Sequence, residues 1–112
     1  MESSRLDKLL EFLQNEPEDA FLKYALATEY LRLNQTDKAL QYYESLIDHH
    51  PDYVGTYYHL GKLYEALNRK SDALNTYQKG METAKAQRDN HAFSELQAVY
   101  REATGWEQDD DY

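Results

Sequence analysis

The chain has 112 residues, with 21 acidic and 12 basic side chains that give a formal net charge of −9. This length predicts one domain, and the acidic balance disfavours nucleic acid as a partner because the field of the protein repels phosphate. The chain has no cysteine for a disulfide or a thiolate metal site, and no run of about 20 apolar residues that could span a bilayer. Its first residues lack the basic start and apolar run of a signal peptide, so the sequence predicts a cytoplasmic protein.

Apolar residues recur with helical spacing along nearly the whole chain, and both prolines fall between the periodic runs. The sequence predicts six helices, near residues 4–15, 20–33, 37–49, 53–67, 72–88 and 91–104. The short connections between them place consecutive helices antiparallel. The last segment, 105–112, holds four acids and no base, which predicts a disordered acidic tail.

Polar residues at the expected helix ends predict where the helices start and stop. A serine, aspartate, threonine or asparagine precedes each helix and can accept a hydrogen bond from a free N–H of its first turn. The predicted N-caps are Ser3 or Ser4, Asp19, Thr36, Asp52, Ser71 and Asn90. The last apolar residue of three helices is followed by Asn34, Asn68 or Gly105. These residues predict helix stops, because asparagine and glycine tolerate the left-handed conformation.

The sequence repeats itself with a period of 34 residues. Pro17 and Pro51 are separated by this distance, and the same shift aligns eight identical pairs. The pairs are Tyr24 with Tyr58, Leu26 with Leu60, Tyr30 with Tyr64, Leu33 with Leu67, Asn34 with Asn68, Ala39 with Ala73, Leu40 with Leu74 and Tyr43 with Tyr77. A fixed period of this size predicts a solenoid, whose usual product is a binding surface and not a reaction.

The second repeat contains the segment YHLGKLY, with Tyr57 before it and Ala73 and Tyr77 after it. This segment resembles the tetratricopeptide pattern of aromatic-x-x-Leu-Gly-x-x-Tyr followed by Ala-x-x-x-aromatic. The first repeat matches the pattern at Leu26, Ala27, Tyr30, Ala39, Tyr43 and Pro51. It departs from the pattern at Lys23, where an aromatic residue is usual, and the second repeat departs at Lys85, where a proline is usual.

The resemblance extends into a half repeat at each end of the chain. The outer matches are Leu9, Phe12 and Pro17, which stand 34 residues before Tyr43, Leu46 and Pro51, and Phe93, Leu96 and Tyr100, which stand 36 residues after Tyr57, Leu60 and Tyr64. The resemblance therefore implies an all-α, right-handed superhelical solenoid over residues 1–104. Its full repeats are expected at about 20–53 and 54–88, and helices 4–15 and 91–104 are expected to cap them. The chain also resembles small bacterial proteins made of a single tetratricopeptide domain.

Small residues predict where the two helices of each hairpin approach most closely. Gly61 in the second repeat and Ala27 in the first are expected to face Ala73 and Ala39, with larger residues around them.

No motif in the sequence indicates catalysis, a metal site or a cofactor. There is no HExxH, no CxxC, no phosphate-binding glycine loop and no nucleophile elbow. His49 and His50 are adjacent and diverge by about 100° around a helix, so they do not form a chelating pair. The sequence therefore predicts a non-enzymatic protein-protein interaction module that binds a peptide or a partner helix.

The first helix of each tetratricopeptide hairpin lines a concave groove, and these helices here carry aromatic and basic side chains. The predicted groove residues are Phe21, Tyr24, Thr28, Arg32, Tyr58, His59, Lys62 and Arg101. Tyrosine and arginine are frequent anchors at interfaces. Two alternatives stay open here: Tyr24 and Tyr58 can pack between neighbouring repeats, and Lys62 can pair with Glu65.

Two other functions compete with peptide binding. The chain can be a self-associating structural protein whose repeats stack on one another, whereas a binding module is expected to be monomeric or at most a weak homo-oligomer. A clamp for a chaperone's terminal carboxylate is less well supported, because only Lys62 fits the lysines and asparagines that such clamps use.

Overall fold

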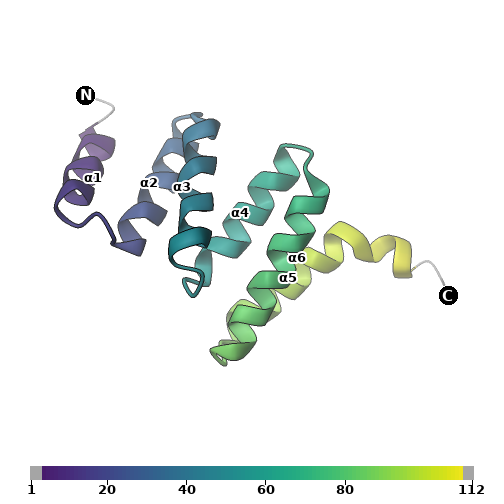
Figure 1. Cartoon of the computed structure of the whole chain (residues 1–112). Coiled ribbons are helices and arrows are strands. Elements are labelled where there is room, and N and C mark those ends of the chain that lie inside the picture. Colours follow the sequence, from purple (N-terminus) through teal and green to yellow (C-terminus); the bar gives the residue numbers. More distant parts are fainter. Residues whose placement is uncertain (1–3, 110–112) are drawn as a thin grey trace. The chain divides into compact units, whose positions relative to one another are not determined.

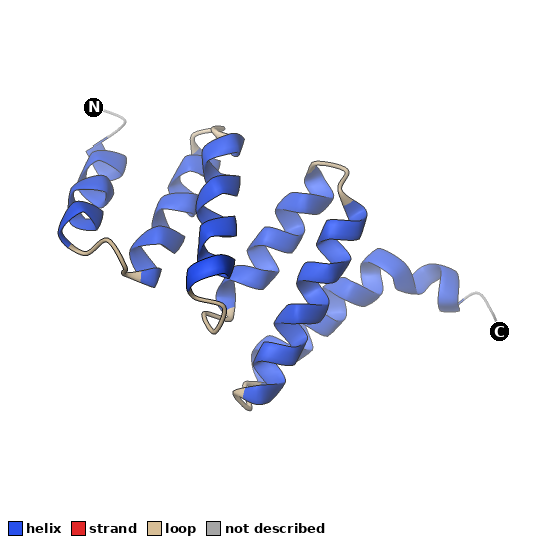
Figure 2. Cartoon of the chain, in the orientation of Figure 1, coloured by secondary structure: helices blue, strands red, loops and turns tan. Residues whose placement is uncertain are grey.

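The computed structural model describes residues 4–109, with the side chains of residues 5–104. The described residues form helices and no strand (Figures 1 and 2). The helices are α1 (Ser4–Asn15), α2 (Ala20–Arg32), α3 (Thr36–His49), α4 (Gly55–Ala66), α5 (Lys70–Ala86) and α6 (Asn90–Asp109). The prediction of an all-α fold with six helices is confirmed for this part of the chain. None of the described helices has the length and apolar character that a membrane crossing requires.

The helices belong to two compact units, which divide between Tyr53 and Val54. In the first unit, α2 packs on both α1 and α3. In the second unit, α5 packs on both α4 and α6, and α4 also contacts α6 (Figure 1). The division falls where the two full repeats were expected to meet, and the predicted domain limits themselves stay a prediction.

Each unit buries apolar side chains at the repeated positions. The buried apolar residues of the first unit are Leu6, Leu9, Ala25, Leu26, Ala27, Tyr30, Ala39, Tyr43 and Leu46. Those of the second unit are Tyr57, Leu60, Leu63, Tyr64, Ala73, Tyr77, Ala84, Leu96 and Val99. The 34-residue period in the sequence is therefore a period of buried positions, as a solenoid requires.

Two glycines permit the closest helix contacts in the second unit. A Cβ atom on Gly61 would overlap the ring of Tyr77 and would lie 2.6 Å from its Cδ1 atom. A Cβ atom on Gly80 would lie 2.5 Å from the Cβ of Tyr57 and 3.0 Å from the Cδ1 of Leu96. The close approach at Gly61 was predicted, but the nearest side chain is the large ring of Tyr77 and not the expected small residue of α5. The glycine therefore supplies the space that a fully buried ring occupies.

Three helices end in a left-handed residue. The φ angles are 63° at Asn34, 61° at Asn68 and 59° at Arg88. In each case the N–H of the following residue donates to the carbonyl five residues before it, at 2.8, 2.8 and 2.9 Å. This hydrogen bond identifies the Schellman type of helix end. The two asparagine stops were predicted, whereas the stop at Arg88 was not.

Aspartates cap two of the helices. The Asp19 carboxylate accepts a hydrogen bond of 2.9 Å from the N–H of Leu22, which confirms Asp19 as the N-cap of α2. The Asp89 carboxylate accepts a bond of 3.0 Å from the N–H of Ala92 at the start of α6. The prediction of Asn90 as this cap is wrong, because Asn90 already belongs to the helix.

Three further cap predictions are wrong. The residues that precede α3, α4 and α5 are Gln35, Val54 and Arg69, in place of the predicted Thr36, Asp52 and Ser71. None of the three makes a side-chain capping bond. Helices α3 and α5 start early because the left-handed asparagine turns the chain directly into the next helix. Helix α1 begins at Ser4, and the alternative cap Ser3 lies outside the described residues.

Helix α6 continues past its predicted end and reaches Asp109. The predicted stop at Gly105 is therefore wrong. A glycine inside a helix costs about 1 kcal/mol relative to alanine, which weakens a helix without ending it. The rest of the predicted tail, residues 110–112, lies outside the described residues.

Candidate binding surface

The four predicted groove residues of the first unit follow one face of α2. Phe21, Tyr24, Thr28 and Arg32 are spaced by three and four residues, which places them in one row along a helix. The side chain of Phe21 is 61% exposed. Thr28 and Arg32 are also exposed, whereas Tyr24 is half-buried.

Tyr24 packs against other tyrosines of its own unit. Its ring centroid lies 5.8 Å from that of Tyr53 and 6.3 Å from that of Tyr43, with a T-shaped geometry to Tyr43. Burial raises the pKa of the Tyr24 hydroxyl. The hydroxyl of Thr28 lies 3.2 Å from the hydroxyl of Tyr43, within hydrogen-bonding distance. This face is thus partly committed to internal packing, and Phe21 is its most accessible ring.

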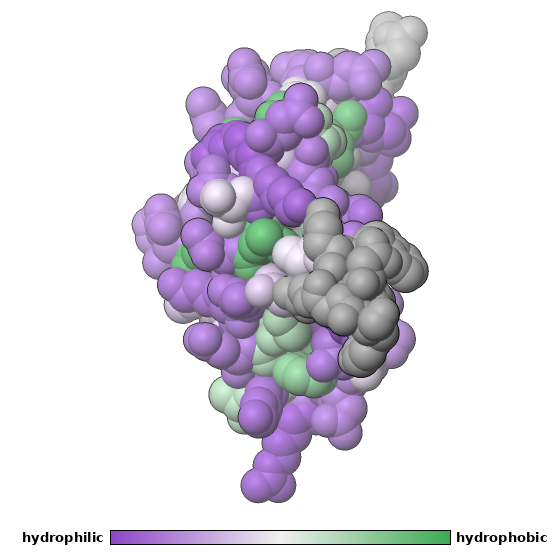
Figure 3. All heavy atoms as spheres, turned by 90° about the vertical axis from the view of Figure 1, so that its right-hand side faces the viewer, coloured by the Kyte–Doolittle hydropathy of each residue, from purple (hydrophilic) through white to green (hydrophobic). Residues whose placement is uncertain are grey.

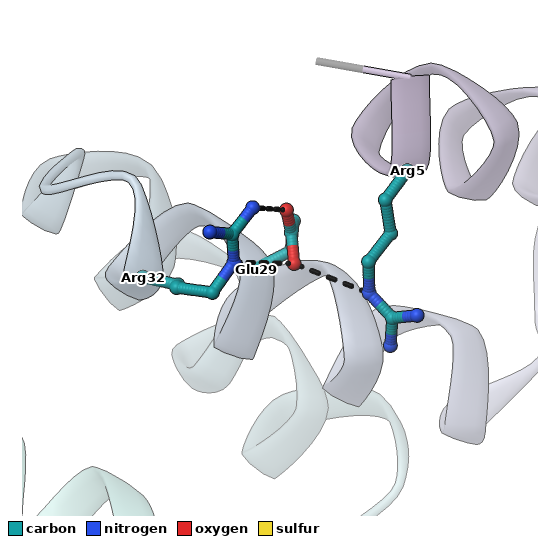
Figure 4. Close-up of polar contacts among 3 residues, drawn as sticks. All are labelled: Arg5, Glu29 and Arg32. Atoms are coloured by element: carbon teal, nitrogen blue, oxygen red, sulfur yellow. Dashed lines mark hydrogen bonds and ion pairs between the residues drawn. The ribbon is translucent and has the colours of Figure 1, made fainter. Parts of the chain in front are cut away.

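Arg32 is held by a buried carboxylate that the sequence reasoning missed (Figure 4). Its Nη2 donates to the Oε2 of Glu29 at 2.5 Å, and its Nε donates to Oε1 at 3.2 Å. The Nε of Arg5, on α1, lies 3.2 Å from the same Oε1. The Glu29 side chain is only 3% exposed, and Arg32 and then Arg5 hold the pKa of this carboxyl below its usual value, although burial opposes them. A glutamate at the repeat position of Leu63 was the available signal.

The second unit places three predicted residues on α4. Tyr58 is half-buried, and His59 and Lys62 are exposed. The rings of Tyr58 and His59 lie 5.4 Å apart in a T-shaped arrangement. Arg101 is exposed on α6, the helix that contacts α4. The same unit therefore holds four of the eight predicted residues on two neighbouring helices.

Glu65 is engaged by a buried tyrosine and not by Lys62. The Tyr77 hydroxyl donates to the Glu65 carboxylate at 2.5 Å. Burial raises the pKa of this hydroxyl, and the carboxylate that accepts its hydrogen bond raises it further. Among residues 5–104, none forms an ion pair with Lys62, which leaves its ammonium group to solvent. A cavity of about 380 Å³ adjoins this region and is lined by Glu65, Asn68, Lys70, Glu102 and Ala103.

A tetratricopeptide-repeat family model matches residues 24–89. The chain belongs to the tetratricopeptide-repeat family. This family is generally non-catalytic, and its fold generally serves as a protein-protein interaction module.

Two solved tetratricopeptide repeat domain structures from Salinibacter ruber are similar to this chain. The crystal structure is 48% identical, covers 78% of this chain and 97% of that chain, and has a TM-score of 0.74. The solution NMR structure is 49% identical, covers 80% of this chain and 90% of that chain, and has a TM-score of 0.77. These likenesses confirm the predicted resemblance to small bacterial tetratricopeptide proteins.

More distant comparisons add only the fold. The crystal structure of MamA is 18% identical, covers 95% of this chain and 69% of that chain, and has a TM-score of 0.62. No curated protein matches this chain.

The tetratricopeptide surface here is mainly polar. The face shown in Figure 3 is largely hydrophilic, with small hydrophobic patches between polar side chains. Within residues 5–104, no group of three His, Asp or Glu side chains could hold a metal ion. The chemistry available on the described inner helices is therefore that of aromatic contact, hydrogen bonding and charge.

Proposed function

We propose that the protein is a non-enzymatic binding module that holds a peptide or a partner helix in the concave groove formed by tetratricopeptide inner helices. The observation that carries this proposal is the side of α4 that bears Tyr58, His59 and Lys62. These side chains stand off the buried stripe of α4, next to a helix that bears the exposed Arg101. On α2, the exposed ring of Phe21 offers a further apolar contact.

The roles of these side chains follow from their chemistry. Tyr58 and Arg101 belong to the residue types that anchor interfaces, because they bury much area and can also donate hydrogen bonds. Lys62 has an ammonium group with no ion-pair partner among residues 5–104, so it favours an acidic group on the partner. An exposed charge of this kind affects the association rate more than the fit.

A peptide selected from a random displayed library on the wild-type protein would test the proposal. We expect Tyr58→Ala to weaken binding by about 1–3 kcal/mol in calorimetry, the usual range for an anchor residue. Lys62→Glu should slow association and change its salt dependence. Gln41→Glu, at an exposed position of α3, is the matched control and should do neither. Unchanged affinity in a folded Tyr24→Ala, Tyr58→Ala double variant would exclude this surface.

Self-association is the second candidate, because several large apolar side chains of the described region are exposed. They are Phe12, Phe21, Leu31 and Leu67. Sedimentation across a range of concentrations separates the two functions. We expect a monomer at micromolar protein, and a mass that rises with concentration would favour the structural role. For a chaperone-tail clamp, Lys62 remains the single matching residue.

A further inference from the structure

Helices α1 and α5 occupy equivalent places two periods apart in the repeat, but they differ in their neighbours. On α5, a Cβ at Gly80 would meet Tyr57 of α4 on one side and Leu96 of α6 on the other. Phe12 stands at the same repeat position on α1, which packs on α2. The Phe12 side chain is nevertheless 52% exposed. The side of α1 that corresponds to the seat of α4 on α5 is thus open to solvent.

This open side combines two cations with an aromatic ring. Arg5, Lys8 and Phe12 follow one another by three and four residues, which places them on one face of α1. Lys8 is exposed and forms no ion pair with any other described residue. The acidic Asp7 and Glu11 fall elsewhere around the helix by the same geometry. In a chain with a net charge of −9, this face is a local cationic surface.

Arg5 is preorganised to receive a carboxylate. Only its Nε pairs with Glu29, and the side chain is 68% exposed. Figure 4 shows that both terminal nitrogens of Arg5 point away from Glu29. Such a pair of N–H groups matches the two oxygens of a carboxylate. Because Glu29 is itself fixed by Arg32, it holds the Arg5 side chain in place.

We infer that the Arg5, Lys8 and Phe12 face of α1 docks an amphipathic helix of a partner protein, which brings carboxylates to the two cations and an apolar side chain to Phe12. A helix is the fitting occupant because α4 covers the equivalent side of α5. Opposite charge selects an acidic helix over a basic one. This docking surface is independent of the proposed binding on the inner helices.

The probe is a synthetic amphipathic helix with two glutamates one turn apart and a leucine one further turn along the same face. A matched peptide carries glutamine at both glutamate positions. Fluorescence anisotropy with the full chain should show binding of the glutamate peptide, and about tenfold weaker binding of the glutamine peptide, since hydrogen bonds to charged groups are the stronger ones. Added salt should weaken binding of the glutamate peptide alone.

Variants of the exposed residues locate the site. Lys8→Glu and Phe12→Ala should each weaken binding about tenfold, as loss of an anchoring contact does. Circular dichroism verifies their fold. Glu11→Gln on α1 and Tyr58→Ala on α4 should leave the affinity within about twofold, since most interface positions outside the anchors contribute little. Equal affinity for the two peptides, full binding by a Lys8→Glu, Phe12→Ala double variant, or no binding at millimolar peptide would each overturn the inference. Loss of binding in Tyr58→Ala alone would assign the peptide to the α4 surface.

Discussion

The α2–α3 and α4–α5 hairpins share one repeat register, yet they make room for the same buried tyrosine differently. Tyr43 and Tyr77 are equivalent, and their side chains are both fully buried. Gly61 faces the Tyr77 ring so closely that a Cβ atom would overlap it. The equivalent residue of the first hairpin is Ala27, which carries a Cβ atom and is fully buried. The register therefore fixes which ring is buried, and the local spacing of the helices decides whether its neighbour must be glycine.

A second pair of positions exchanges bulk between the two hairpins. Tyr57 on α4 stands against Gly80 on α5. The equivalent residues of the first hairpin are Lys23 and Leu46, so the larger apolar side chain lies on the second helix. Lys23 is only 8% exposed, and its ammonium group lies 4.0 Å from the Glu18 carboxylate. A lysine can bury its aliphatic stem in this way while its charge remains near water. The departure of Lys23 from the family pattern is thus matched by a change at its partner position.

The polar partners of the two tyrosines also differ. Tyr77 donates to a carboxylate, on Glu65, whereas the Tyr43 hydroxyl meets the neutral hydroxyl of Thr28. The charged acceptor gives the stronger bond. Stability in the second hairpin therefore depends on one buried hydroxyl more than it does in the first.

The largest predicted effect tests the close contact at Gly61. Gly61→Leu should destabilise the protein by about 3 kcal/mol, because overpacking at a close contact costs about 1–3 kcal/mol and the Tyr77 ring is enclosed. Urea unfolding followed by circular dichroism measures this cost. The reverse exchange in the other hairpin, Ala27→Gly, is the control and should cost about 1 kcal/mol from helix propensity. If Gly61→Leu unfolds at the wild-type midpoint, the hairpins do not differ in spacing.

The next effect tests the polar partners. Tyr77→Phe should cost about 2 kcal/mol, since it removes a hydrogen bond to a charged group. Tyr43→Phe should cost about 1 kcal/mol, the usual value for a bond between neutral groups. Urea midpoints at neutral pH measure both. Equal losses would show that the charge on Glu65 does not strengthen the bond.

The pH dependence of the same variant gives a second test. The pKa of Tyr77 is raised in the folded protein, whereas that of an unfolded tyrosine is about 10. The contribution of this group is therefore complete below about pH 10 and is lost as the pH rises above it. We expect the wild type to lose stability more steeply than Tyr77→Phe in that alkaline range.

The sequence predicted the features that repeat. The period of 34 residues, the tyrosines and alanines of the buried stripe and the left-handed asparagines all recur, so each repeat supports the assignment made in the other. The fold follows from this redundancy. The stop at Arg88 could not be predicted, because arginine does not favour a positive φ and no repeat partner signals it.

The candidate surface was less predictable, because exposure depends on tertiary neighbours. Helix geometry placed Tyr24 off the buried stripe, but its packing on Tyr53 depends on where the chain turns after α3. The Glu29 cluster needs an arginine from α1 that lies 24 positions earlier in the chain, and no local pattern connects the two. Helix starts were missed for a similar reason, since a tight turn can replace a side-chain cap.

The smallest predicted effect separates a helix start with a side-chain cap from one without it. In the first unit, Asp19→Ala should cost about 1 kcal/mol, because it removes the bond to the N–H of Leu22 at the start of α2. In the second unit, Ser71→Ala should stabilise the protein by up to about 0.5 kcal/mol, because Ser71 lies inside α5 and alanine is the better helix former. The sign of the change therefore distinguishes the two arrangements. Thermal unfolding of both variants beside the wild type measures it, and a loss of about 1 kcal/mol in Ser71→Ala would identify Ser71 as a cap after all.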